Sequence, residues 1–178
     1  MKVLAIIFDG FEELEATAPF ALLRRANIDL DISSYNTTVT GSHNISITNV
    51  LKLKELNYTQ YDCLLIPGGA HYKQLTKETY VHNIIKYFIE ENKVIATICA
   101  APTILGMLGY LENKKYTCFT AMNQDFKGVY TDNGVEVDEN IITAKSAAYS
   151  IDFAYAIIEK LIGKAALIQL QKKIYYEK

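Results

Sequence analysis

The sequence of 178 residues has few cysteines, no excess of charge of either sign and no long apolar run. Its three cysteines, Cys63, Cys99 and Cys118, are scattered, and none belongs to a CxxC pair. This usage argues against a disulfide scaffold and favours a reducing compartment, so we expect a cytoplasmic protein. The net charge of −2 comes from interspersed acids and bases, which gives no reason to expect nucleic acid as a partner.

No run of about 18 apolar residues occurs, so we expect no membrane span. The opening MKVLAIIFDG has no small-residue cleavage site and soon becomes acidic, which indicates a buried strand and not a signal peptide. Half of the residues are apolar, and no linker, repeat or low-complexity tract interrupts them. We therefore predict one globular domain over residues 1–178.

Apolar runs of strand length alternate with helical patterns along the chain. The expected strands are Val3–Phe8, Asp29–Ser34, Asn44–Thr48, Asp62–Pro67, Val94–Ile98, Tyr116–Phe119, Gly134–Val137 and Ile141–Ala144. The expected helices are Glu12–Ala26, Val81–Asn92, Pro102–Leu111, Ser150–Ile162 and Lys164–Tyr175. Pro19 should kink the first helix or shift its start. The alternation predicts an α/β fold with a mainly parallel sheet and helices on both faces.

Ligands of such sheets bind beyond the carboxyl ends of the strands. Three segments with chemistry-bearing residues are expected there, namely Asp9–Glu15, Gly68–Tyr72 and Cys99–Pro102. We therefore look for a functional site at this edge.

Cys99 stands in V-I-A-T-I-C-A-A-P-T, at the junction of an apolar strand and a helix. Small alanines permit a tight turn, and Pro102 suits an early helical position. The partial positive charge of a helix N-terminus lowers the pKa of a nearby thiol, and the turn directs backbone amides at whatever the sulfur attacks. These features favour a nucleophile, while position alone leaves open a buried structural cysteine.

Glu15 lies close to the apolar stripe of the first helix and can share a helix face with Glu12. Acidic residues in a first turn are ordinary partners of the helix dipole. A carboxyl on a buried face, however, is expensive unless it is hydrogen-bonded. If protonated, Glu15 would donate a hydrogen bond to a thiolate and carry protons during turnover.

The pair Gly68-Gly69 follows a strand, so an amide there would help to bind an oxyanion, although a lone glycine pair is weak evidence and a plain turn is the alternative. No GxGxxG or GK[ST] pattern follows, which excludes a phosphate loop. His71 comes next and is a candidate base, with a solvated loop histidine as the more frequent alternative. The three histidines have no metal-ligand spacing, so we expect no metal.

Together these motifs make the chain similar to the ThiJ/PfpI superfamily, in its DJ-1-type branch. The likeness rests on G-F-E-E-L-E-A, D-C-L-L-I-P-G-G and A-T-I-C-A-A-P-T in this order, with S-I-D-F-A-Y-A-I-I-E-K-L as the closing helix. It runs from Lys2 to about Lys172. The resemblance implies a flavodoxin-like three-layer sandwich, a cysteine at a nucleophile elbow, a homodimer and no cofactor.

The resemblance also implies roles for individual residues. Cys99 would be the nucleophilic or oxidation-sensitive cysteine, and Glu15 the acid that is hydrogen-bonded to it. The backbone amides of Gly69 and Ala100 would form the oxyanion site. Further residues are expected to line the site, with Arg25 near the dimer contact and His43 approaching from the partner subunit: Gly68, His71, Phe119, Arg25 and His43.

The chain departs from the family pattern in two loops. Phe119 stands where relatives often have a site histidine, so a cysteine–histidine dyad through it is impossible. A G-P-G-like turn is replaced by S-A-A-Y at Ser146–Tyr149. Ala100 stands where the protease-like branch has histidine, which disfavours a peptidase. Proton transfer would therefore fall to Glu15, with or without His71.

Three functions remain open. The first is a cofactor-free enzyme of the glyoxalase or deglycase kind, which would convert reactive carbonyls, or their adducts on amines or thiols, to 2-hydroxy acids. The second is a redox sensor or protective chaperone whose Cys99 oxidises to a sulfinate. The third is a non-catalytic binding domain, since fold alone does not fix function.

Overall fold

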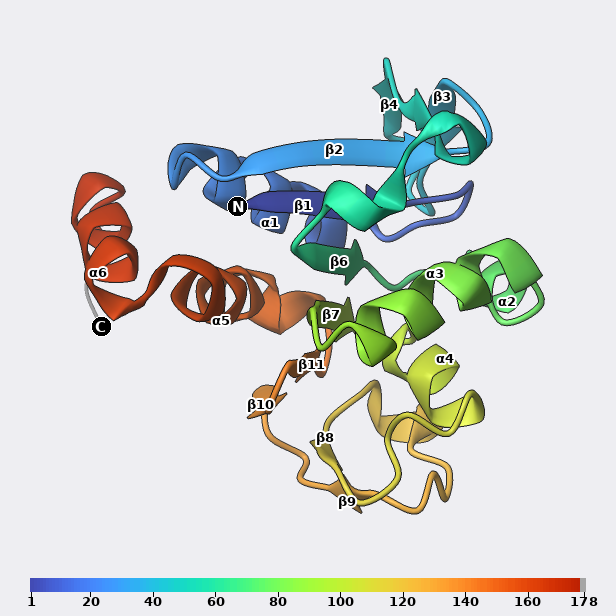
Figure 1. Ribbon diagram of the computed structural model, residues 1–178. Coiled ribbons are helices and arrows are strands. Elements are labelled where there is room, and N and C mark those ends of the chain that lie inside the picture. The colour runs from blue at the N-terminus through green and yellow to red at the C-terminus, as the bar shows by residue number, and fades with distance from the viewer. Residues whose placement is uncertain (177–178) are drawn as a thin grey trace.

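The computed structural model describes residues 1–176, which are built around one seven-stranded sheet (Figure 1). In spatial order the strands are β10 (Val135–Asp138), β11 (Ile141–Ala144), β7 (Val94–Ile98), β6 (Cys63–Ile66), β1 (Lys2–Ile6), β2 (Asp29–Ser34) and β5 (Leu51–Lys52). Every neighbouring pair is parallel except β10 with β11. This confirms the mainly parallel sheet expected from the sequence.

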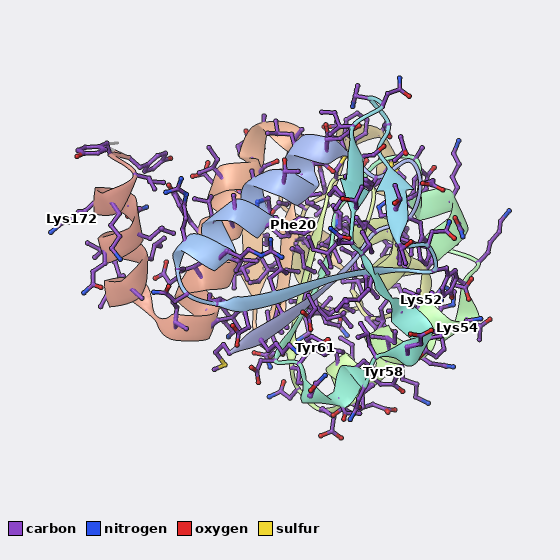
Figure 2. All side chains as sticks on the ribbon, turned by 90° about the horizontal axis from the view of Figure 1, so that it is seen from above. Phe20, Lys52, Lys54, Tyr58, Tyr61 and Lys172 are labelled. Atoms are coloured by element: carbon purple, nitrogen blue, oxygen red, sulfur yellow. The ribbon has the colours of Figure 1, made fainter. Side chains whose placement is uncertain are left out.

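Helices cover both faces of the sheet. On one face lie α1 (Glu13–Arg25), α5 (Ser150–Ile162) and α6 (Lys164–Lys173), and on the other α2 (Tyr72–Leu75), α3 (Thr79–Glu90) and α4 (Pro102–Met107). Figure 2 shows α1, with Phe20 labelled, beside α5, while α6 with Lys172 projects from the body. The structure thus has the three layers of the predicted sandwich.

Smaller elements complete the described chain. The strands β3 (Thr38–Thr40) and β4 (Ser46–Thr48) form an antiparallel hairpin, and β8 (Lys115–Tyr116) pairs with β9 (Val129–Tyr130). Short 3-10 turns are η1 (Leu53–Glu55), η2 (Tyr58–Gln60), η3 (Thr120–Met122) and η4 (Ala147–Tyr149). No helix within residues 1–176 has both the length and the apolar character needed to cross a membrane.

The apolar pattern of each element explains its place. All five residues of β7 are buried, because a central parallel strand has helices on both faces. Along α3 the buried positions Val81, Ile84, Ile85 and Phe88 follow helical spacing and face the sheet. Successive side chains along a strand point to opposite faces of the sheet. They therefore pack into two separate hydrophobic cores, one under each helical layer.

Several expected boundaries are wrong. Pro19 lies inside α1, and the helix still begins at Glu13, so proline does not shift its start. The helix expected over Pro102–Leu111 ends at Met107, because Gly109 takes a φ of +83°, the left-handed conformation that terminates helices. The strand expected over Tyr116–Phe119 shortens to Lys115–Tyr116. These differences lie at ends of elements, where local pattern is weakest.

Parallel strands place their carboxyl ends at the same edge of the sheet. In Figure 1 the arrowheads of β1, β2 and β6 point to the same side of the molecule. The segments after β1, β6, β7 and β11 consequently meet at this edge, and they carry the candidate residues.

Candidate active site

Cys99 occupies a strained turn between β7 and α4. Its φ is +63°, a left-handed backbone conformation that side chains disfavour. The surrounding backbone holds this turn, because the Cys99 amide donates to the Ala144 carbonyl at 2.8 Å and the Cys99 carbonyl accepts from the Phe119 amide at 2.8 Å. The Ala100 amide donates to the sulfur. The turn thus presents a half-buried thiol at the carboxyl edge of the sheet, where the sequence predicted it.

Glu15 approaches the same point from the first turn of α1. It is only 1 % exposed, and its carboxyl is hydrogen-bonded to the Cys99 sulfur. Its Oε2 accepts from the Gly68 amide at 2.9 Å, and the Ala147 amide of η4 donates to the same carboxyl. Three separate segments therefore meet at this buried acid.

The acid and the thiol compete for a proton in a poorly solvated place. Burial, with a smaller contribution from the Glu12 charge, raises the pKa of Glu15 to about 7, against hydrogen bonds that lower it. Burial and the Glu15 carboxylate raise the pKa of the Cys99 thiol. The expected lowering of the thiol pKa is therefore wrong, because these two effects outweigh the Ala100 amide at the start of α4.

Gly68 is required by the close approach of these groups. A Cβ at this position would lie 2.5 Å from Glu15 Oε2 and 2.7 Å from Cys99 Cβ. Gly69 adopts a φ of +99°, and a Cβ at this position would overlap the Glu12 backbone nitrogen. The amide of Gly68 is used by Glu15, so the oxyanion role of the Gly69 and Ala100 amides stays a prediction.

His71 is buried, so the expected solvated loop histidine is wrong. Its Nδ1 accepts from the Phe8 amide at 3.2 Å, and its Nε2 donates to the Pro67 carbonyl at 2.8 Å. Burial lowers the pKa of His71 to about 4, so the ring is neutral. With both ring nitrogens engaged, His71 supports the turn after β6 and has no free atom to act as the candidate base.

The other residues expected to line the site differ in position. Phe119 adjoins Cys99 through its backbone, and its side chain is 46 % exposed. Arg25 is exposed in the last turn of α1, ten residues beyond Glu15, or about 15 Å along the helix axis. It therefore does not line the site of its own subunit, and the expectation that placed it there is wrong.

His43 lies in the turn of the β3–β4 hairpin and contacts two glutamates instead of Cys99. Its Nδ1 is 2.8 Å from Glu13 Oε2 and 3.9 Å from Glu12 Oε1, and its backbone amide donates to Glu13 Oε1 at 2.6 Å. The ion pair with Glu13 raises the pKa of His43. Its expected approach to a partner subunit stays a prediction.

Glu12, Glu13 and His43 form the one group within residues 1–176 that offers three metal-ligand atoms, all within 4.8 Å of one another. The oxygens of Glu13 already accept from the His43 and Ile45 amides and from the His43 ring. These bonds and the ion pair account for the cluster as an anchor between α1 and the hairpin. A cation there would have to displace the imidazole proton.

Sequence reasoning missed two contacts of the acid. The sequence placed the loop Ser146–Tyr149 near the site but gave no role to its backbone. In the structure the Ala147 amide of this loop donates to the Glu15 carboxyl. Glu12 caps α1 by accepting from the Glu15 amide at 2.7 Å. No side-chain motif indicates a backbone amide. Glutamate is not among the preferred N-cap residues, so only the acid at the N3 position, Glu15, matches the capping pattern.

Comparison with known proteins places this geometry in a family. The model of the DJ-1/PfpI family matches residues 1–160. The crystal structure of DJ-1beta from Drosophila melanogaster superposes with a TM-score of 0.93 at 26 % identity, over 99 % of this chain and 98 % of that chain.

Curated relatives agree with this result. The protein DJ-1 homolog B of Arabidopsis thaliana is 31 % identical over 176 residues, which are 96 % of this chain; the chain spans 40 % of that protein's length. A protein named a deglycase from Pyrococcus horikoshii is 30 % identical over 152 residues, covering 83 % of this chain and 92 % of that protein.

Proposed function

The chain belongs to the DJ-1/PfpI family, and we propose that it is a cofactor-free, cysteine-dependent enzyme acting on reactive carbonyls. The observation that carries the proposal is the contact between a half-buried Cys99 at a strained elbow and the buried carboxyl of Glu15. The deglycase name of the Pyrococcus relative supports the same substrate class. The proposed substrates are small aldehydes of the glyoxal type and their adducts on amines or thiols.

The proposed reaction uses Glu15 as a proton shuttle. As the Cys99 sulfur attacks the aldehyde carbon of methylglyoxal, Glu15 takes the thiol proton and returns one to the new alkoxide, giving a hemithioacetal. Glu15 then moves the carbon-bound proton to the neighbouring carbonyl carbon through an enediol, which leaves a thioester on Cys99. Water cleaves the thioester and releases lactate, so oxidation and reduction balance within the substrate and no cofactor takes part.

The surroundings of the pair suit this sequence of steps. A carboxyl with a pKa of about 7 takes and returns protons with little energetic cost near neutral pH. The Gly69 and Ala100 amides would hold the alkoxide, since both belong to turns that border Cys99. Because Glu15 must be ionised to accept the thiol proton, turnover should rise as pH increases through 7.

The test is lactate production from methylglyoxal by wild type, Cys99→Ser and Glu15→Gln, with Cys63→Ser as the matched control. We expect both site variants to lose at least 100-fold in kcat/KM, in line with the loss of a nucleophile or general base. Cys63 is fully buried within β6, away from the elbow, so its conservative variant should keep turnover. Equal lactate yield from wild type and both site variants would remove the proposal.

A redox role is the second candidate, because Cys99 alone among the three cysteines is partly exposed. We propose that mild peroxide adds two oxygens to Cys99, with protonated Glu15 donating a hydrogen bond to the resulting sulfinate. Peptide mass analysis after peroxide treatment tests this. Equal oxidation at Cys63 and Cys118, or none at Cys99, would contradict it.

We also propose that the chain forms a homodimer through the start of α1 and the β3–β4 hairpin. Leu14 and Ile45 are 51 % and 57 % exposed, and the Ile45 amide donates to the Glu13 carboxyl at 3.3 Å, so the two segments that carry these aliphatic side chains adjoin. Light scattering should give about twice the 20.1 kDa mass of one chain. Leu14→Lys should shift the mass toward that of the monomer, and a monomeric wild type would contradict the proposal.

A further inference from the structure

Three hydrogen bonds form a closed ring behind the reactive pair. The Glu12 amide donates to the Gly68 carbonyl at 2.9 Å, and the Gly68 amide donates to Glu15 Oε2 at 2.9 Å. The Glu15 amide in turn donates to Glu12 Oε2 at 2.7 Å. Glu12 therefore fixes both the backbone of Glu15 and the turn that binds the Glu15 side chain.

From this ring we propose that Glu12 is a positioning residue for the Cys99–Glu15 pair: its carboxylate caps α1 at Glu15 and places a second negative charge beside the proton that the pair shares. The inference rests on the proposed function and deepens it, because that proton is the one the reaction moves. Glu12 does not touch the reacting sulfur and acts only through Glu15.

The charge of Glu12 is available to the pair because His43 is committed elsewhere. The His43 ring lies 2.8 Å from Glu13 Oε2 but 3.9 Å from Glu12 Oε1. The positive charge of His43 is therefore paired with Glu13 more closely than with Glu12. The Glu12 charge raises the pKa of Glu15 and that of Cys99. A like charge on the same helix face has this effect because it penalises each further ionisation.

Few other ionisable groups face Glu15 from the elements around it. The turn after β7 contributes Cys99, α1 itself contributes Glu13, and the β3–β4 hairpin contributes His43, which lies beyond Glu12. Within residues 1–176, the turn after β6 contributes the Gly68 amide, while the ring of His71 in this turn is bonded to the Phe8 amide and the Pro67 carbonyl. The 3-10 turn η4 contributes the Ala147 amide. Removing the Glu12 charge should consequently have a visible effect on the titration of the pair.

The experiment compares Glu12→Gln with Glu12→Asp. Glutamine keeps an oxygen that accepts the Glu15 amide but removes the charge, whereas aspartate keeps the charge and is a favourable capping residue. The readout is the pH dependence of Cys99 alkylation by iodoacetamide, followed by intact mass between about pH 5.5 and 9. Cys63 and Cys118 are buried, so alkylation of the folded protein reports on Cys99.

We expect Glu12→Gln to move the midpoint of the first ionisation to lower pH by at least 0.5 units, about a threefold change in proton affinity. Glu12→Asp and the control Glu91→Gln, which removes an exposed carboxyl at the end of α3, should stay close to wild type. Equal midpoints for Glu12→Gln and wild type would overturn the proposal, as would equal shifts for Glu12→Gln and Glu12→Asp.

Two further measurements keep the outcome interpretable. Thermal unfolding identifies a variant that fails to fold, in which case Glu12→Ser, a neutral capping residue, replaces Glu12→Gln and should show the same downward shift. Alkylation of Cys99 by iodoacetamide can be measured whether or not the protein converts methylglyoxal, so the two readouts are independent. A shifted midpoint in a protein that makes no lactate would therefore uphold the role of Glu12 and reject the proposed function, whereas lactate production with an unshifted midpoint would do the reverse.

Discussion

Replacing Glu15 by glutamine should change how the stability of the protein depends on pH. Glu15 is 1 % exposed, and burial raises its pKa from 4.5 to about 7. The folded protein thus retains the Glu15 proton between these two pH values, while the unfolded chain has lost it. Stability falls over this window because unfolding releases a proton. Glutamine has no proton to lose, so its variant should not show this part of the fall.

The size of the effect follows from the displacement of the pKa. A displacement of 2.5 pH units, from 4.5 to about 7, corresponds to about 3 kcal/mol of unfolding free energy. This contribution is fully present below pH 4.5 and is lost by pH 7, so Glu15→Gln should gain about 3 kcal/mol relative to wild type across this range. The direction is opposite to that of Glu13, whose pKa is lowered by its hydrogen bonds with the hairpin.

The assay is urea unfolding of wild type and Glu15→Gln at several values between about pH 4.5 and 8, under reducing conditions. The difference between the two proteins cancels the titrating groups that do not interact with Glu15, including buried His71 and the ion-paired Asp31. Glu91→Gln, at an exposed position, controls for the loss of a carboxyl as such. A constant difference between wild type and Glu15→Gln across this range would refute the reasoning, because Glu15 would then ionise as easily in the folded protein as in the unfolded chain.

Three more predictions concern the backbone at Gly68 and Cys99 and the buried imidazole of His71. Gly68→Ala should lose about 1–3 kcal/mol of stability in urea unfolding and slow Cys99 alkylation at least tenfold, because its Cβ would lie 2.5 Å from Glu15 Oε2. The control Gly109→Ala, whose Cβ meets nothing within 4 Å, should leave the alkylation rate unchanged. Equal alkylation rates in the two variants would contradict this prediction. Cys99→Gly should be about 1 kcal/mol more stable to unfolding than Cys99→Ala, since a φ of +63° favours glycine, and an alanine variant of equal stability would show that the elbow is unstrained. His71→Phe should lose about 2 kcal/mol of stability, because it leaves the Phe8 amide and the Pro67 carbonyl without partners, yet keep the pH midpoint of Cys99 alkylation; a moved midpoint would indicate that His71 takes part in proton transfer.

The pattern of apolar residues was enough to predict the layers of the fold. The strands Asp29–Ser34, Val94–Ile98 and Ile141–Ala144 and the helix Ser150–Ile162 have the bounds that the sequence indicated. The strands β7 and β11 are buried along their whole length and α5 is amphipathic, so in these three elements burial defines where they begin and end. Short edge strands such as β5 and β9 carry no such signal, and their pairing depends on contacts made only in the folded chain.

The residues around the reactive thiol divide in the same way. Local sequence identified Cys99, Glu15 and the paired glycines, because a strand followed by small residues and a proline, an acid beside a buried stripe, and a glycine pair each have a local physical reason. Only the tertiary structure decided how these groups ionise. The proton affinity of Glu15 depends on its depth of burial and on amides from Gly68 and Ala147, which lie 53 and 132 residues away along the chain.

The histidines show why such decisions need three dimensions. His71 and His43 both follow a glycine closely in sequence, yet His71 is enclosed and neutral while His43 is exposed and paired with Glu13. Which nitrogen is free, and which charge lies nearby, follows from the packing of distant segments and not from neighbours in the chain. The sequence by itself determined the sheet, its carboxyl edge and the residues placed there, because these depend on periodicity. Charge, proton location and hydrogen-bond partners came only from the folded structure, because they depend on desolvation and on contacts across the sheet.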